Sequence, residues 1–105
     1  MSPAAEDALT DILEYTINQW GLTQAERYKN QLLERVRSVA RGELPHPRPC
    51  AVLMQGKRTG IGLCYCREGG HFIILRESDA RIDIVDFVHE SRDLDRLIDG
   101  LAGMP

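Results

Sequence analysis

The side chains able to exchange protons are few, and they lie where apolar segments begin or end. His71 precedes the apolar run at 72–75, and His89 and Glu90 follow the final apolar stretch. A histidine base with arginines around a phosphate suits RNA cleavage without a metal, because that reaction needs acid–base groups and stabilised charge. The candidates for such a site are His71, Arg76 and His89. The alternative is that histidines at strand ends are capping or surface residues. No spacing-defined catalytic or nucleotide-binding motif occurs, so the residues alone give little support to an enzyme.

The cysteines predict neither a disulfide framework nor a metal centre. The chain has an odd number of cysteines, namely Cys50, Cys64 and Cys66, and it opens without a secretory signal. Cys64 and Cys66 would share one face of a strand, with His71 near in sequence. A closed zinc site needs four ligands at suitable spacing, so we expect small buried hydrophobic residues, no metal and no cofactor.

The net charge of −3 conceals three segments of alternating sign. Residues 1–26 carry five acids and no basic side chain, 27–76 carry ten basic groups against three acids, and 77–105 carry three arginines and eight acids. Overall acidity argues against a protein whose main task is to grip nucleic acid. The basic middle segment instead indicates where an acidic partner segment would bind.

The length of 105 residues allows a single domain, 1–105, with one core. No apolar run approaches the roughly 20 residues that cross a bilayer. Because the start also lacks a basic region followed by an apolar stretch, we expect a cytoplasmic protein with no membrane contact.

Two amphipathic helices open the chain. Ser2 is a good N-cap, Pro3 suits the first helical position, and Gly21 ends the first helix. Thr23 and Glu26 predict a capping box at the start of a second helix that closes at Gly42. The short linker between these segments predicts an antiparallel helical hairpin.

The second half predicts an antiparallel meander of three strands. The first strand covers about 60–66, Gly69-Gly70 forms a turn, and the apolar run 72–75 is a central strand covered on both faces. In the third strand, Ile82, Ile84 and Val88 are expected on one face and Asp83, Val85 and Phe87 on the other. The proline-rich run 44–49 should be extended. Residues 52–54 should form a short strand or only cover the core. Residues 91–103 should form a short helix, and we favour packing of this helix on the sheet over a role in binding a partner.

The order of these residues resembles the ParE toxins of the RelE/ParE superfamily of type II toxin–antitoxin systems, especially those of plasmid partition and addiction loci. At the start the likeness is carried by Ser2-Pro3-Ala4-Ala5, Leu9, Ile12, Tyr15-Thr16, Trp20-Gly21, Ala25 and Tyr28. Later it is carried by 71–74 and by 87–94, whose His89 and Asp93 form a terminal His-x-x-x-Asp element. The resemblance implies an α+β fold, in which the helical hairpin packs on a three-stranded antiparallel sheet with a short C-terminal helix.

The resemblance also implies a toxin that inhibits DNA gyrase by binding and is neutralised in a hetero-oligomer by a ParD-like antitoxin, a DNA-binding dimer. Nucleic acid would be reached only through that antitoxin. The alternative is a RelE-type, ribosome-dependent messenger RNA endoribonuclease, and a third is a degenerate toxin that only binds antitoxin. Three features favour the gyrase branch: no aromatic residue follows Phe87, the chain has only two lysines, and its net charge is acidic.

No motif defines the contact residues. The candidates for gyrase contact are Arg58, Arg67, Arg76, His89 and Arg92. The candidates for antitoxin binding are Trp20, Arg27, Tyr28, Arg35 and Arg76. Family members usually begin with a strand before the Ser-Pro element, so we expect either that the true start lies upstream or that the sheet lacks one strand. A missing strand would leave an open edge that a partner segment could fill.

Overall fold

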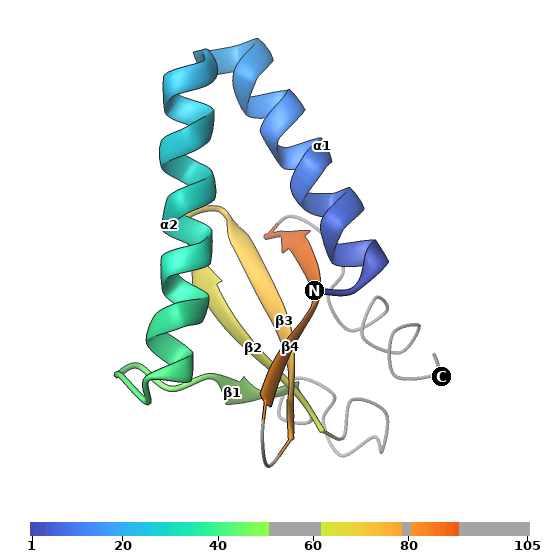
Figure 1. The fold of residues 1–105 in the computed structure, drawn as a ribbon, viewed down its shortest axis with the longest axis vertical. Helices are drawn as coiled ribbons and strands as arrows, with labels where there is room; N and C mark the ends of the chain where they lie inside the picture. The colour runs from blue at the N-terminus through green and yellow to red at the C-terminus, as the bar shows by residue number, and fades with distance from the viewer. Residues whose placement is uncertain (51–61, 79–80, 91–105) are drawn as a thin grey trace.

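The computed structural model describes residues 1–50, 62–78 and 81–90. Helices α1 (Pro3–Trp20) and α2 (Leu22–Ala40) precede strands β1 (Arg48–Pro49), β2 (Leu63–Glu68), β3 (His71–Ser78) and β4 (Arg81–His89). The strands form one antiparallel sheet in the order β1-β2-β3-β4, and the helical hairpin extends beyond it (Figure 1). The predicted α+β class is confirmed. The predicted three strands become four within the described residues, and the segments predicted at 52–54 and 91–103 lie outside them.

The first helix begins and ends where the sequence predicts. The Ser2 hydroxyl accepts a hydrogen bond from the amide of Ala5 at 3.0 Å, Pro3 is the first helical residue, and Gly21 follows the last one. The capping box is wrong, because α2 already begins at Leu22 and Thr23 lies inside the helix. The reason is Gly21, whose φ of 93° reverses the chain in one residue and whose carbonyl accepts from the amide of Ala25 at 3.1 Å. The antiparallel hairpin itself is confirmed.

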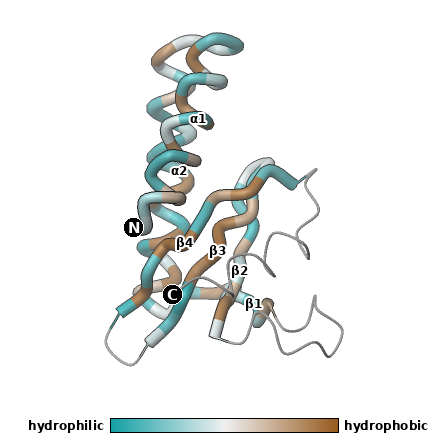
Figure 2. Tube along the Cα trace, turned by 90° about the vertical axis from the view of Figure 1, so that its right-hand side faces the viewer, coloured by the Kyte–Doolittle hydropathy of each residue, from teal (hydrophilic) through white to brown (hydrophobic). Residues whose placement is uncertain are grey.

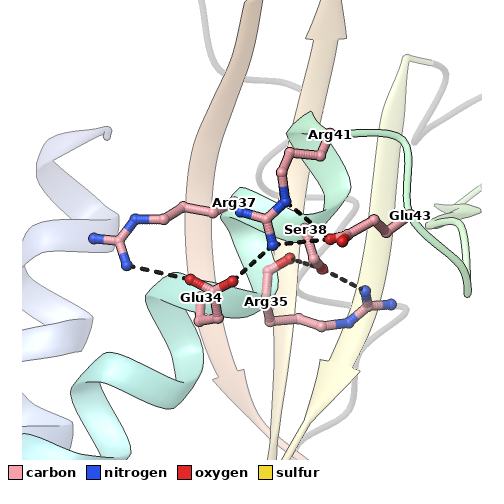
Figure 3. A network of polar contacts seen from close by, with 6 residues as sticks. All are labelled: Glu34, Arg35, Arg37, Ser38, Arg41 and Glu43. Atoms are coloured by element: carbon pink, nitrogen blue, oxygen red, sulfur yellow. Dashed lines mark hydrogen bonds and ion pairs between the residues drawn. The ribbon is translucent and has the colours of Figure 1, made fainter.

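Arginines and glutamates hold the end of α2 and the connection that follows (Figure 3). Arg41 pairs with Glu34 at 2.7 Å and with Glu43 at 2.8 Å, and hydrogen bonding to Arg41 lowers the pKa of Glu34. Arg35 donates to the carbonyl of Pro45 at 2.8 Å and to the Ser38 hydroxyl at 3.0 Å. These contacts direct the chain from α2 towards the sheet.

Strand β1 lies in the proline-rich run and was not predicted to pair. Arg48 lies opposite Tyr65 and Pro49 opposite Cys64 at one side of the sheet. A proline cannot donate to a ladder, but it is tolerated in a strand at the edge. The predicted extended conformation of 44–49 is therefore found as a strand at Arg48–Pro49, whereas residues 44–45 form a bend. The pairing of this strand with β2 is not predicted by the sequence.

Strand β3 separates two apolar clusters, and it carries a continuous hydrophobic run at 72–75 (Figure 2). Ile73 and Leu75 pack with the helices, while Ile74 and Phe72 belong to the cluster on the other face. The predicted burial of this strand on both faces is confirmed. No helix among the described residues is long and apolar enough to span a membrane.

Strand β4 contains a β-bulge at Val85. Asp86 lies opposite Ile74, but Ile84 lies opposite Leu75, so one residue of β4 is extra. The predicted strict alternation is therefore wrong beyond Val85: Phe87 joins Ile84 on the helix face, and Val88 joins the opposite cluster. The bulge also turns His89, two residues after Phe87, towards the helices.

Candidate functional site

Tyr28 joins α2 to the turn between β2 and β3. Its hydroxyl lies 2.6 Å from Nδ1 of His71, accepts from the amide of Gly70 at 3.2 Å, and lies 3.4 Å from the carbonyl of Glu68. One turn along α2, Gln31 donates to the Glu68 carboxylate at 2.7 Å. Burial raises the pKa of Tyr28, so its hydroxyl stays protonated and can both donate and accept.

The close approach of this ring depends on Gly69. Gly69 and Gly70 form the predicted two-residue turn, and Gly69 has a φ of 57°. A Cβ at Gly69 would lie 2.6 Å from Cε1 of Tyr28, which is closer than carbon atoms can approach. The Gly-Gly pair therefore serves both the turn and the packing of Tyr28 against it.

His71 and His89 lie directly opposite each other on β3 and β4. Their ring centroids are 5.3 Å apart and their planes nearly perpendicular. Burial lowers the pKa of His71, the neighbouring His89 acts in the same direction, and Glu90 opposes both. His71 is therefore a neutral imidazole at neutral pH.

The two histidines line a pocket of about 220 Å³ between α1 and β4. Its lining combines apolar residues, two aspartates and the two histidines. The described residues that line it are Ala8, Asp11, Ile12, His71, Asp86, Phe87, Val88 and His89. We call it the lower pocket.

A second hollow, the upper pocket, lies nearer the tip of the hairpin. It measures about 490 Å³ and is lined by Thr16, Trp20, Gln24 and Tyr28. Its α1 residues continue the four-residue spacing of the lower pocket, because Ala8, Ile12, Thr16 and Trp20 recur on one face of the helix. We call the two pockets together the interhelical groove. Ala8 to Trp20 spans about 18 Å along α1.

The tip of the hairpin exposes large apolar side chains. Trp20 is 74% exposed, Tyr15 65% and Leu22 61%, and the eleven residues 15–25 carry no charge. A neutral apolar patch with exposed aromatic rings is typical of a protein interface. The groove and the tip are therefore the candidate binding surface.

The structure assembles only part of the predicted ribonuclease site. His71 and His89 are in contact, but Arg76 lies five residues along β3 from His71, about 16 Å away and on the opposite face. Of the gyrase candidates, Arg67 forms an ion pair with Glu90. Arg58 and Arg92 lie outside the described residues.

The antitoxin candidates are also divided. Trp20 and Tyr28 line the upper pocket, and exposed Arg27 adjoins Tyr28 on α2. Arg35 makes its two contacts within the chain, and Arg76 is distant from the groove. The sequence reasoning missed Asp11 and the lower pocket. The four-residue spacing of Ala8, Ile12, Thr16 and Trp20 could have identified the α1 wall. No signal in the sequence indicates the bulge that turns His89 towards the helices.

The cysteines pack as predicted. Cys50 and Cys66 are buried in the two apolar clusters and Cys64 is partly buried. Burial raises the pKa of all three thiols, that of Cys50 to about 12, so they stay protonated. Within the described ranges, no group of three His, Cys, Asp or Glu side chains could hold a metal ion.

A helical hairpin on an antiparallel sheet, with one pocket between the helices and another between α1 and β4, defines a small α+β protein. Residues 1–94 match the family model described as "ParE toxin of type II toxin-antitoxin system, parDE". The chain is 31% identical over 98 residues to Toxin ParE1 of Mycobacterium tuberculosis, in both strain CDC 1551 / Oshkosh and strain ATCC 25618 / H37Rv. The alignment covers 91% of this chain and 92% of those proteins. The chain therefore belongs to the ParE toxin family of type II toxin–antitoxin systems, and membership implies an antitoxin partner.

Proposed function

We propose that this protein is a toxin that inhibits DNA gyrase by binding it, and that a ParD-like antitoxin neutralises it by occupying the interhelical groove. The observation that carries the antitoxin half of this proposal is Trp20, a 74% exposed indole beside the 490 Å³ upper pocket. Exposed Trp and Tyr side chains at a pocket are the residues that dominate interface energies. The toxin would act in the cytoplasm and contribute to plasmid stabilisation.

The dimensions of the groove suit an amphipathic segment of the antitoxin. A length of about 18 Å accommodates three helical turns or five to six extended residues. Such a segment would place apolar anchors in the upper pocket between Trp20 and Tyr28. Exposed Arg27 beside this pocket would orient acidic residues of the partner.

Family membership and the separation of Arg76 from the two histidines support gyrase inhibition over RNA cleavage. The proposed gyrase contacts are Arg58, Arg67, Arg76, His89 and Arg92. One observation favours the alternative, a RelE-type endoribonuclease: the contact between His71 and His89. That pair could supply acid–base groups, but the third candidate of the set, Arg76, is too distant to share their phosphate.

A gyrase supercoiling assay beside a translation assay separates these activities. We expect the purified toxin to stop supercoiling with accumulation of cleaved DNA, and to leave messenger RNA intact. A variant with His71→Gln and His89→Gln should keep translation unaffected as well. Truncated messages that disappear in this variant would establish the ribonuclease instead. Inactivity in both assays would leave a protein that only binds antitoxin.

Replacing Trp20 with Ala tests the antitoxin surface. We expect antitoxin affinity to fall by about 30-fold or more, because a central interface tryptophan contributes at least about 2 kcal/mol. The melting temperature should hardly change, because the side chain is largely exposed. The control is Leu44→Ala, since Leu44 is 79% exposed but lies outside the groove. Equal affinities of the two variants, by isothermal titration calorimetry, would contradict the proposal.

A further inference from the structure

Tyr28 takes part in two features of the molecule. It lines the upper pocket, and it also packs on the turn between β2 and β3. At that turn its hydroxyl lies 2.6 Å from Nδ1 of His71 and accepts from the amide of Gly70 at 3.2 Å. Its ring occupies the space that a side chain at Gly69 would need. The orientation of one wall of the upper pocket is therefore set by contacts made at the turn.

The position of His71 is fixed by the sheet. His71 lies on β3 opposite Glu68 of β2 and opposite His89 of β4, so its backbone is flanked by a strand on both sides. Its ring centroid lies 5.3 Å from that of His89, with the two planes at 85°, and 5.6 Å from that of Tyr28. The tyrosine hydroxyl is thus bonded to a side chain that the sheet already holds in place.

We propose that His71 is a positioning residue for antitoxin binding: its hydrogen bond with the Tyr28 hydroxyl holds the tyrosine ring as a preformed wall of the upper pocket. This inference rests on the proposed function and adds to it a residue that acts through another. A side chain that is already in its bound orientation loses less conformational entropy when a partner binds, and this raises the affinity. Without the hydrogen bond, the antitoxin would have to immobilise the ring itself.

The competing explanation is that His71 contacts the antitoxin directly, because it also lines the lower pocket. Tyr28→Phe distinguishes the two, since it removes the hydroxyl and keeps the ring. We expect Tyr28→Phe and His71→Leu each to weaken antitoxin binding by about two- to ten-fold, the cost of immobilising one side chain. The double variant should bind no more weakly than either single variant, because both changes break the same hydrogen bond. Losses that multiply in the double variant would overturn the proposal.

His71→Asn is the matched rescue variant. Asparagine and leucine have the same branching, but the carboxamide places a polar atom close to the position of Nδ1 in the histidine ring. We expect His71→Asn to retain most of the affinity that His71→Leu loses. In NMR spectra of the free toxin, the ring signals of Tyr28 should shift in His71→Leu and stay near their original positions in His71→Asn. Equal losses of affinity in the two variants would overturn the proposal.

The affinities are measured by isothermal titration calorimetry with the full-length antitoxin. The control is His46→Leu, in the exposed connection before β1, which should bind as the unaltered toxin does. Loss of affinity in Trp20→Ala with none in His71→Leu or Tyr28→Phe would overturn this inference and leave the proposed function intact. If none of the three variants weakens binding, the upper pocket is not the antitoxin site and both proposals are wrong.

Discussion

Tyr28 and Gly69 show how one pair of residues sets the distance between a helix and a turn. The tyrosine hydroxyl makes three polar contacts around the turn, and its ring occupies the space that a side chain at Gly69 would need. The absence of a Cβ at Gly69 is therefore part of the packing between α2 and the sheet. A sequence pattern reveals the turn glycine but not the ring that depends on it.

We predict that Gly69→Ala destabilises the fold by about 2–4 kcal/mol. The positive φ of 57° costs an L-residue about 1–2 kcal/mol, and the overlap with Tyr28 adds a packing penalty. Urea unfolding measures the change. The control is Gly62→Ala, because Gly62 has a φ of 81° but no described residue within 4 Å of its Cβ position. If both variants lose the same stability, the ring contact contributes nothing.

At the scale of elements, the bulge in β4 decides which side chains reach the helices. Without it, strict alternation after Ile84 would turn Phe87 and His89 away from the helix face. Ser2 forms hydrogen bonds to the two residues at the bulge. Its amide donates to the carbonyl of Ile84 at 2.9 Å, and its hydroxyl donates to the carbonyl of Val85 at 2.6 Å. The first turn of α1 and the bulge are thus held by one serine.

We predict that Ser2→Ala lowers the free energy of unfolding by about 1–3 kcal/mol. The substitution removes a helix cap and a part-buried hydrogen bond to Val85 together. Thermal melting and urea titration both report the loss. Thr10→Ala is the matched control, because the Thr10 hydroxyl is exposed and bonds only to Glu6 within its own helix. A loss no greater than that of the control would show that Ser2 does not hold the bulge.

The elements that could be predicted from the sequence are those with local signals. Ser2, Pro3 and Gly21 mark the ends of α1, and the apolar run at 72–75 identifies the central strand. The bulge could not be predicted, because Val85, Phe87 and Val88 are all apolar and satisfy either register. The capping box predicted at Thr23 is wrong because Gly21 both ends one helix and begins the next. Only the tertiary contacts of these residues decide between the possibilities.

At the scale of the whole molecule, the candidate site is assembled from segments that are distant in sequence. The groove joins one face of α1, Tyr28 of α2 and two strand ends 18 residues apart. Its α1 wall follows from helical spacing, and His71 and His89 were recognised as polar strand ends. Their contact, and the entry of Asp11 into the same pocket, depend on sheet register and on the bulge. The binding chemistry of the groove is therefore a property of the fold.

The half-buried imidazole of His71 makes the stability of the whole molecule depend on pH. Burial lowers its pKa in the folded protein, with His89 contributing in the same direction. The unfolded chain binds the proton near the ordinary value of about 6.5. Between the two values the unfolded state therefore holds more protons, and stability rises with pH. The contribution of His71 is fully present above about pH 7 and is lost as pH falls through about 6.5.

We predict that the free energy of unfolding falls between pH 7 and pH 5, with a slope of at most about 1.4 kcal/mol per pH unit from this proton. His71→Gln should flatten the slope in this range. His46→Gln, in an exposed part of the connection before β1, should retain it. NMR titration of the imidazole should also show a lowered pKa of His71, which rises towards its ordinary value in His89→Gln because one repelling neighbour is removed. A slope that persists in His71→Gln would place the proton on another group.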